Sequence, residues 1–248
     1  MTLKDTSFVD LMLKRICNVL IIANPYDAFI LEDDGRVDEK IFSEYARLGL
    51  RFPPRFIQVA CQHAAETHMA TEKIDLVICM PAAEDNSVFD IARSIKHDYP
   101  AVPIVVLTPF SHGITRRMQN EDLSAFEYVF CWLGNTELLL SIIKLMEDRM
   151  NLEHDIRSAG VQMILVVEDS IRFYSSILPN LYRFVLQQSL ELDGAEALLA
   201  VGAVVGHDDE VIAAGAELVL ENDKILVAET DNARNLSALL MQCLGNGQ

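Results

Sequence analysis

Residues that could carry chemistry stand directly after the apolar runs of this chain, where an open parallel sheet collects its functional groups. In the first 150 residues these positions hold Asn24-Pro25, Met80-Pro81, Thr108-Pro109 and Cys131-Trp132. Further along, Glu168-Asp169 follows the run Val161–Val167. Paired carboxylates supply the hard oxygen ligands that Mg²⁺ prefers. Glu168 and Asp169 are therefore the candidate Mg²⁺ ligands, although capping of the next helix explains the two acids equally well.

The elements that position these residues alternate along the first domain. Five apolar runs have the length of buried strands: Asn18–Ala23, Phe56–Ala60, Asp75–Met80, Ile104–Thr108 and Tyr128–Trp132. Amphipathic stretches predict the helices Lys40–Leu48, His63–Thr71, Ser87–Asp98, Ile114–Glu121 and Thr136–Met150. In the last helix we expect Glu147, Asp148 and Arg149 to face water. Continuous apolar strands joined by helices predict a doubly wound α/β domain with a parallel five-stranded sheet.

A second α/β unit is predicted to begin after this domain, with the first domain covering residues 1–155 and the second 156–248. It opens with the strand Val161–Val167 and a helix from Ile171 to Leu190. From about residue 190 the chain is acidic and free of aromatic residues. Two short strands or a hairpin are expected at Ala216–Leu220 and Lys224–Glu229, followed by a helix at Ala233–Leu244. Because only 88 residues follow position 160, we expect this unit to be incomplete or divergent.

Composition excludes several classes of function. The chain has 248 residues and a formal net charge of −17, which repels phosphate backbones and anionic lipids and argues against a nucleic-acid or membrane-surface binder. It shows no apolar run long enough to span a membrane and no signal-peptide core, so we expect a cytoplasmic protein. The five cysteines show no metal-binding spacing, and Cys17, Cys79 and Cys131 are expected to be small core residues.

The strand-end pattern of the first domain resembles a response-regulator receiver domain. The matching stretches are Asp75–Pro81, Val102–Thr108 and Glu127–Trp132. The resemblance implies an acidic pair, a phosphoacceptor aspartate, a Ser/Thr and a lysine at the strand ends. This sequence instead has Asn24 and Pro25 in place of the acidic pair, Met80 in place of the acceptor and Cys131 in place of the lysine, and it keeps Thr108 as the switch-like residue.

These replacements remove the chemistry of phosphotransfer from the first domain. Binding Mg²⁺ and a phosphoryl group requires clustered carboxylates, and a thioether cannot accept a phosphoryl group. The first domain is therefore predicted to be a pseudo-receiver without a phosphoacceptor. In the second unit, the stretch Met163–Ser170 matches the start of a receiver and keeps the acids Glu168 and Asp169.

Longer stretches are similar to the amino-terminal regulatory region of bacterial phosphoenolpyruvate synthase and pyruvate phosphate dikinase-like proteins. They fall within residues 4–190: Lys4–Phe8, Asn18–Glu44, Pro53–Val59, Ile104–Phe110, Asn120–Ala125, Trp132–Leu140 and Val167–Leu178. The resemblance implies tandem receiver-like modules, with phosphoenolpyruvate-utilising catalytic domains as partners. None of the catalytic parts of that family is found in this sequence.

Three functions follow from these patterns. The first is a regulatory protein without enzymatic activity that acts through contacts with a protein partner or as a homodimer. The second is a phosphorelay in which the second unit receives phosphate from a histidine kinase, and the third is the regulatory part of a phosphoenolpyruvate-utilising enzyme. A contact face is predicted at Tyr128, Phe130 and Trp132, since aromatic residues are enriched at interfaces; burial of all three rings in the core is the alternative.

Overall fold

The structure is a computed structural model that describes residues 13–32, 36–82, 87–109, 121–159, 162–167, 170–191, 199–204 and 225–229. The chain divides into two compact units, Ile16–Ile143 and Met1–Arg15 together with Lys144–Gln248. We call them the five-stranded unit and the three-stranded unit. The division falls inside one long helix, whereas the sequence placed the domain boundary at residue 155, further along the same helix.

The five-stranded unit is built on an all-parallel sheet. Its strands are β1 (Asn18–Ile22), β2 (Arg55–Val59), β3 (Leu76–Cys79), β4 (Ile104–Pro109) and β5 (Tyr128–Trp132), in the order β2-β1-β3-β4-β5. This order, with parallel pairing throughout, defines the doubly wound flavodoxin-like fold that receiver domains share. The predicted fold class of this unit is confirmed.

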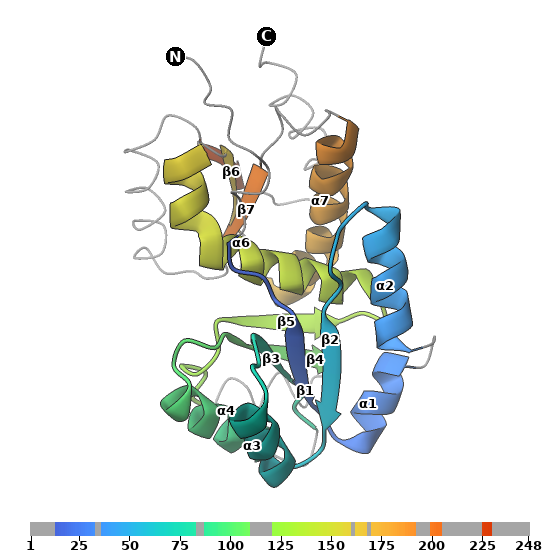
Figure 1. The fold of residues 1–248 in the computed structure, drawn as a ribbon, viewed down its shortest axis with the longest axis vertical. Helices are drawn as coiled ribbons and strands as arrows, with labels where there is room; N and C mark the ends of the chain where they lie inside the picture. Colours follow the sequence, from blue (N-terminus) through green and yellow to red (C-terminus); the bar gives the residue numbers. More distant parts are fainter. Residues whose placement is uncertain are drawn as a thin grey trace. The chain divides into compact units, whose positions relative to one another are not determined.

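Helices cover both faces of this sheet (Figure 1). The described helices are α1 (Pro25–Glu32), α2 (Val37–Arg47), α3 (Gln62–Thr71), α4 (Ser87–Asp98) and the start of α6 (Glu137–Ala159). Figure 1 shows α3 and α4 together on one side and α1 and α2 on the other. The sequence did not predict α1, because it lacks an amphipathic pattern: its outward face is aromatic. The predicted helix Ile114–Glu121 lies outside the described residues, apart from Glu121.

The core lies where α3 and α4 pack against the sheet. Leu20, Val77, Ile104 and Val106 are fully buried in this cluster, and Phe89 meets Phe126 edge to face with ring centroids 5.9 Å apart. Cys79 and Cys131 are buried as predicted, whereas Cys17 is exposed. Cys17 precedes β1, and its main-chain N–H donates to the Asp75 carboxylate (2.9 Å), so its side chain lies outside the strand.

Glu127 links two neighbouring strands at the amino ends of β4 and β5. Its carboxylate accepts the N–H of Ile104 (2.7 Å) and pairs with the Lys96 ammonium (2.7 Å). Lys96 also donates to the carbonyl oxygen of Val102 (3.1 Å). The three contacts fix α4 to the start of β4, at the edge opposite the candidate site.

The three-stranded unit contains β6 (Gln162–Val167), α7 (Ile171–Glu191), β7 (Leu199–Val204) and β8 (Ile225–Glu229). Its sheet has the order β7-β6-β8, and both pairings are parallel. β8 lies within the strand expected at Lys224–Glu229. The sequence did not predict β7. The other strand expected there, Ala216–Leu220, lies outside the described residues, and so does the expected helix Ala233–Leu244.

Helix α6 carries buried polar side chains in the part that belongs to the three-stranded unit. Glu147 and Asp148 are 3% and 9% exposed, so the prediction that they face water is wrong, while Arg149 is exposed as predicted. Asp148 accepts a hydrogen bond from the Tyr182 hydroxyl of α7 (2.7 Å), and Glu147 pairs with Lys144 (2.7 Å). Specific partners of this kind offset the cost of burying charge.

Candidate functional site

The carboxyl edge of the five-stranded sheet is the candidate site, and Asn24 organises its first loop. The Asn24 side chain accepts the N–H of Asp27 (2.8 Å) and donates to the Asp27 carboxylate (2.8 Å). The Asn24 carbonyl oxygen accepts the N–H of Ala28 (2.9 Å). Asn24 is therefore the N-cap of α1, and Pro25 fits the first helical position, where no N–H is needed. The loop after β1 is a helix cap.

Asp27 is a carboxylic acid at this edge that the sequence analysis missed. It is 5% exposed, and burial raises the pKa of its carboxyl, while the hydrogen bond from Asn24 opposes that shift. The four-residue spacing Asn24-Pro-Tyr-Asp27 was the available signal, since it matches a reciprocal cap between an N-cap residue and the third helical residue. Asn24 and Asp27 therefore form two hydrogen bonds with each other, which engage the side-chain polar groups of both residues.

The next two strand ends are buried and weakly polar. Met80 is 2% exposed, and its N–H donates to the carbonyl oxygen of Ile22 (2.9 Å), which extends the pairing of β1 and β3 by one residue. Burial strongly raises the pKa of the Cys79 thiol, which stays protonated. Thr108 is 8% exposed, and its hydroxyl donates to the carbonyl oxygen of Pro109 (3.1 Å). Met80 and Cys79 offer no hard oxygen ligand for a cation.

The last strand holds the predicted contact face. Phe130 is fully buried and Trp132 is 8% exposed, whereas Tyr128 is half-buried with its ring centroid 6.0 Å from that of Phe130. Leu133, directly after the strand, is 42% exposed. In this conformation Tyr128 and Leu133 are the members of this region that a partner could reach. Cys131 is buried beside Thr108, its register partner on β4.

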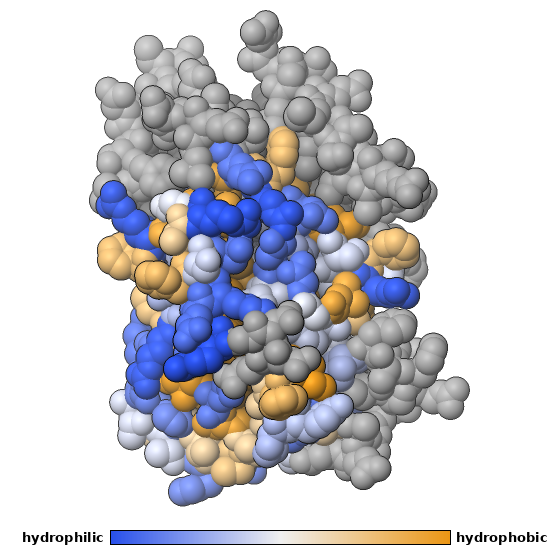
Figure 2. Space-filling view, turned by 90° about the vertical axis from the view of Figure 1, so that its right-hand side faces the viewer, coloured by the Kyte–Doolittle hydropathy of each residue, from blue (hydrophilic) through white to orange (hydrophobic). Residues whose placement is uncertain are grey.

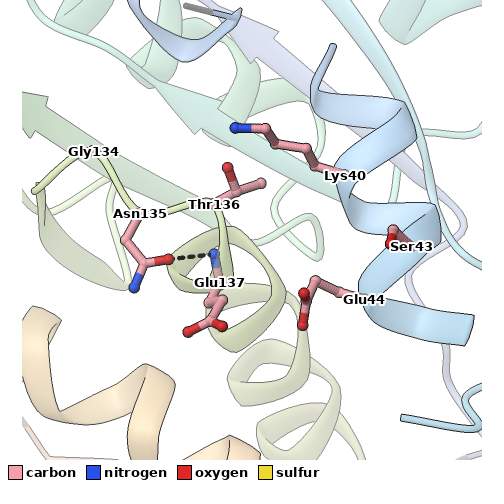
Figure 3. A pocket seen from close by; sticks show the side chains of 7 residues that line it. All are labelled: Lys40, Ser43, Glu44, Gly134, Asn135, Thr136 and Glu137. Carbon is pink, nitrogen blue, oxygen red and sulfur yellow. Dashed lines mark hydrogen bonds between the residues drawn. The ribbon is translucent and has the colours of Figure 1, made fainter. Parts of the chain in front are cut away.

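A surface pocket of about 310 Å³ lies beside this edge, between α2 and the start of α6 (Figure 3). Lys40, Ser43 and Glu44 enter from α2, and residues 134–137 form the opposite wall. Outside the pocket lining, Arg47 bridges the two walls, with its guanidinium 2.5 Å from Glu44 and 3.7 Å from Glu137. In the pocket, Lys40 favours binding of an anion, whereas Glu44 and Glu137 disfavour it. The charges of the lining therefore do not indicate a particular ligand.

The candidate Mg²⁺ ligands Glu168 and Asp169 lie outside the described residues. They directly follow β6 in the sequence, and the last residue of β6, Val167, is in register with Glu229 of β8. The same register in the other unit pairs Ile22 with Cys79. Glu229 thus takes the strand position that Cys79 takes in the five-stranded unit. Among the described residues, no three His, Cys, Asp or Glu side chains are grouped as a metal site would require.

Comparison with known proteins finds a distant structural likeness. The chain is similar to the signal receiver domain of an HD domain-containing protein from Pseudomonas fluorescens Pf-5, with a TM-score of 0.38 and 13% identity, covering 58% of this chain and 95% of that chain. No protein-family model and no curated protein sequence matches the chain. The fold class rests on the strand order and register given above. The similarity to phosphoenolpyruvate-utilising proteins stays a sequence-based prediction.

No helix in the described part of the chain is long and apolar enough to cross a membrane.

Proposed function

We propose that the five-stranded unit is a regulatory module of receiver fold that does not accept a phosphoryl group and acts through protein contacts. The observation that carries this proposal is the end of β3, where Met80 stands at 2% exposure. Phosphoryl transfer to a protein requires an oxygen or nitrogen nucleophile and an electrostatic clamp on the transferred group. A buried thioether provides neither.

The loop after β1 supports the same proposal. Both polar groups of the Asn24 side chain are engaged with Asp27, and Asp27 is itself buried. Recruiting the Asp27 carboxylate to a metal would compete with the hydrogen bond that it accepts from the Asn24 amide, and a hydrogen bond to a charged group is worth about 1.5–3 kcal/mol. The polar groups of the loop after β1 are thus engaged in hydrogen bonds that stabilise the start of α1.

The experiment that tests this function is phosphorylation of the full chain by acetyl phosphate with Mg²⁺, read by intact mass. The matched variant carries Glu168→Gln and Asp169→Asn, which removes the candidate acids of the other unit. We expect no phosphoryl adduct on this variant. An adduct that persists in the variant and maps to residues 16–143 would refute the proposal.

A second candidate function, phosphotransfer in the three-stranded unit, is favoured by its strand register. β8 ends on Glu229 in register with the end of β6, and Glu168-Asp169 follows β6 in the sequence. In this proposal Glu168, Asp169 and Glu229 supply the carboxylate oxygens that Mg²⁺ prefers as ligands. In this role the unit would receive phosphate from a histidine kinase. Signals near residue 169 should broaden first on titration with Mn²⁺, and the Glu168→Gln, Asp169→Asn variant should lose that broadening. Unchanged broadening in the variant would show that Mn²⁺ binds at other residues.

The regulatory function requires a partner. A catalytic protein that uses phosphoenolpyruvate is the candidate partner that the sequence resemblance implies, and the β5 region, with half-buried Tyr128 and exposed Leu133, is its candidate contact face. Co-purification of the full chain with such a protein, and its loss in Leu133→Asp, tests this pairing.

A further inference from the structure

The side chain of Asn151 on α6 binds the main chain of the segment that precedes β1. Its Oδ1 atom accepts the N–H of Lys14 (2.8 Å), and its Nδ2 atom donates to the carbonyl oxygen of Lys14 (2.7 Å). The same Nδ2 atom donates to the carbonyl oxygen of Glu147, which lies one turn earlier on α6 (2.8 Å). Asn151 is 2% exposed, so its amide is engaged in hydrogen bonds and shielded from water.

The hydrogen bonds between Asn151 and the segment involve only main-chain atoms of Lys14. An asparagine amide carries a donor and an acceptor side by side, as a peptide group does. Asn151 therefore binds Lys14 in the way that a residue of an antiparallel strand binds its partner, by exchanging one donor and one acceptor. This binding does not depend on which side chain stands at position 14.

Burial of side chains contributes little to holding this segment. Leu13, Lys14 and Arg15 are all exposed, and Leu13 is 65% exposed. Hydrophobic residues lie among hydrophilic ones on the described surface in Figure 2, as is common for proteins, so the exposure of Leu13 does not by itself indicate a partner. A segment that buries little apolar surface can open at a low free-energy cost while the rest of the protein stays folded.

A second anchor holds the chain directly after this segment. The Asp75 carboxylate accepts the main-chain N–H groups of Cys17 (2.9 Å) and Asn18 (3.1 Å). Ile16, which precedes them, is 1% exposed and belongs to the core. The start of β1 is therefore fixed by contacts that do not involve Asn151.

The two anchors belong to different units. Lys14 and Asn151 are part of the three-stranded unit, and Asp75 is part of the five-stranded unit. The chain passes from one unit to the other at residues 15–16 and again, inside α6, at residues 143–144. When Lys14 is bound to Asn151, the chain is anchored on both sides of residues 15–16. When Lys14 is released, α6 still connects the units.

We propose that residues 13–15 form a strap that detaches from Asn151 while both units stay folded. Hydrogen bonds from one side chain hold the strap, and the Asp75 anchor keeps β1 in place when the strap opens. Opening changes the connection between the units and leaves the five-stranded sheet intact. This inference goes beyond the proposed function and does not depend on it, because it involves neither phosphoryl transfer nor the β5 region.

Native-state hydrogen exchange of the full chain, followed by NMR at low urea concentrations, tests the strap. We expect the Lys14 amide to exchange through local opening, at a rate that does not depend on urea. The amides of Leu20 and Ile21, which are fully buried in β1, should exchange faster as urea is added, because their exchange requires unfolding of the sheet.

A pair of matched variants tests the role of Asn151. Asn151→Ala removes the acceptor of the Lys14 N–H, so it should accelerate exchange at Lys14 about tenfold or more and leave Leu20 and Ile21 unchanged. The control, Asn180→Ala, removes an exposed amide of α7 in the same unit, which donates to the Ser176 carbonyl oxygen (3.4 Å). It should leave exchange at Lys14 unchanged.

Exchange at Lys14 that accelerates with urea in parallel with exchange at Leu20 would show that the segment is released only by unfolding, and would overturn the inference. An unchanged rate at Lys14 in Asn151→Ala would overturn it too. Equal acceleration at Lys14, Leu20 and Ile21 in that variant would show a general loss of stability and would also contradict the strap. Phosphorylation of the five-stranded unit would refute the proposed function without affecting these results.

Discussion

Exchanging the amide of Asn24 for a carboxylate tests whether the loop after β1 is a helix cap. Asn24→Asp has nearly the same shape and keeps an oxygen that accepts the Asp27 N–H, so the N-cap itself survives. The substitution removes the N–H that donates to the Asp27 carboxylate and places a second carboxylate at that 2.8 Å contact. It also restores an acid to a position where the receiver resemblance implies one.

The expected loss of stability is large and depends on pH. A hydrogen bond to a charged group contributes about 1.5–3 kcal/mol, and the repulsion of two carboxylates adds to its loss. We expect Asn24→Asp to lower the unfolding free energy by about 2–4 kcal/mol at pH 7. Toward pH 4 the two carboxyl groups share a proton, and the loss should shrink to roughly 1 kcal/mol or less.

Urea unfolding followed by Trp132 fluorescence measures this effect, because the chain has one tryptophan and it lies in the five-stranded unit. The double variant Asn24→Asp with Asp27→Asn exchanges donor and acceptor, and it should recover most of the stability. Asn24→Ala, which loses both hydrogen bonds, should be destabilised at both pH values. A change below about 0.5 kcal/mol at pH 7 in Asn24→Asp, or no recovery in the double variant, would refute the reasoning.

Four further outcomes follow from the five-stranded unit. Trp132→Ala should lower the unfolding free energy by about 3–5 kcal/mol, measured by circular dichroism, since the ring is 8% exposed. Tyr128 is half-buried, so Tyr128→Ala should lower the unfolding free energy by less than half of that amount. Equal losses in the two variants would contradict the assigned burial. Phe52→Gly should raise the unfolding free energy by roughly 1 kcal/mol, because glycine adopts a φ of +62° without strain, and a loss would contradict this. Glu127→Gln removes the charge that pairs with Lys96, so it should lower the unfolding free energy measured in urea by about 1–2 kcal/mol at low salt and by less at high salt. Equal losses at both salt concentrations would count against the ion pair. Finally, burial raises the pKa of Asp27, so the folded state binds its proton more tightly than the unfolded state does, and stability falls as pH rises above about 4. Asp27→Asn should remove this decline in stability, which urea titrations at a series of pH values would show.

The sheet could be predicted from the sequence because each strand is a short continuous apolar run. Tyr128–Trp132 was predicted with the bounds that the structure has, and Asn18–Ala23 differs from β1 by one residue. Strands buried on both faces carry this signal wherever they occur. The strand order is set by pairing between distant segments, which the apolar runs themselves do not reveal.

Helix α1 was missed for a physical reason. Its outward side chains are Tyr26 and Phe29 and its inward polar residue is Asp27, so no amphipathic period appears. The spacing of Asn24 and Asp27 alone predicts the cap, but comparison with the receiver pattern led to the interpretation of Asn24 as a replaced acid. A polar residue after a strand can serve the helix that follows it as well as a ligand.

Helix α6 shows the converse error. Glu147 and Asp148 were placed in water because charged residues usually are, yet both are buried. Their burial depends on Lys144 and on the Tyr182 hydroxyl of α7, which is distant in the sequence from Asp148. A pattern within one helix carries no information about a hydrogen-bond partner on another. The helix runs without interruption through residues 137–159, where the sequence has no glycine or proline.

The most direct test of the central claim is to locate any phosphoryl group on the full chain. The chain is incubated with acetyl phosphate and Mg²⁺, and acyl phosphates are trapped by borohydride reduction and mapped by peptide mass spectrometry. We expect no reduced residue among positions 16–143, with Asp27 and Asp75 recovered unmodified. A reduced aspartate within those positions, formed in proportion to acetyl phosphate, would contradict it.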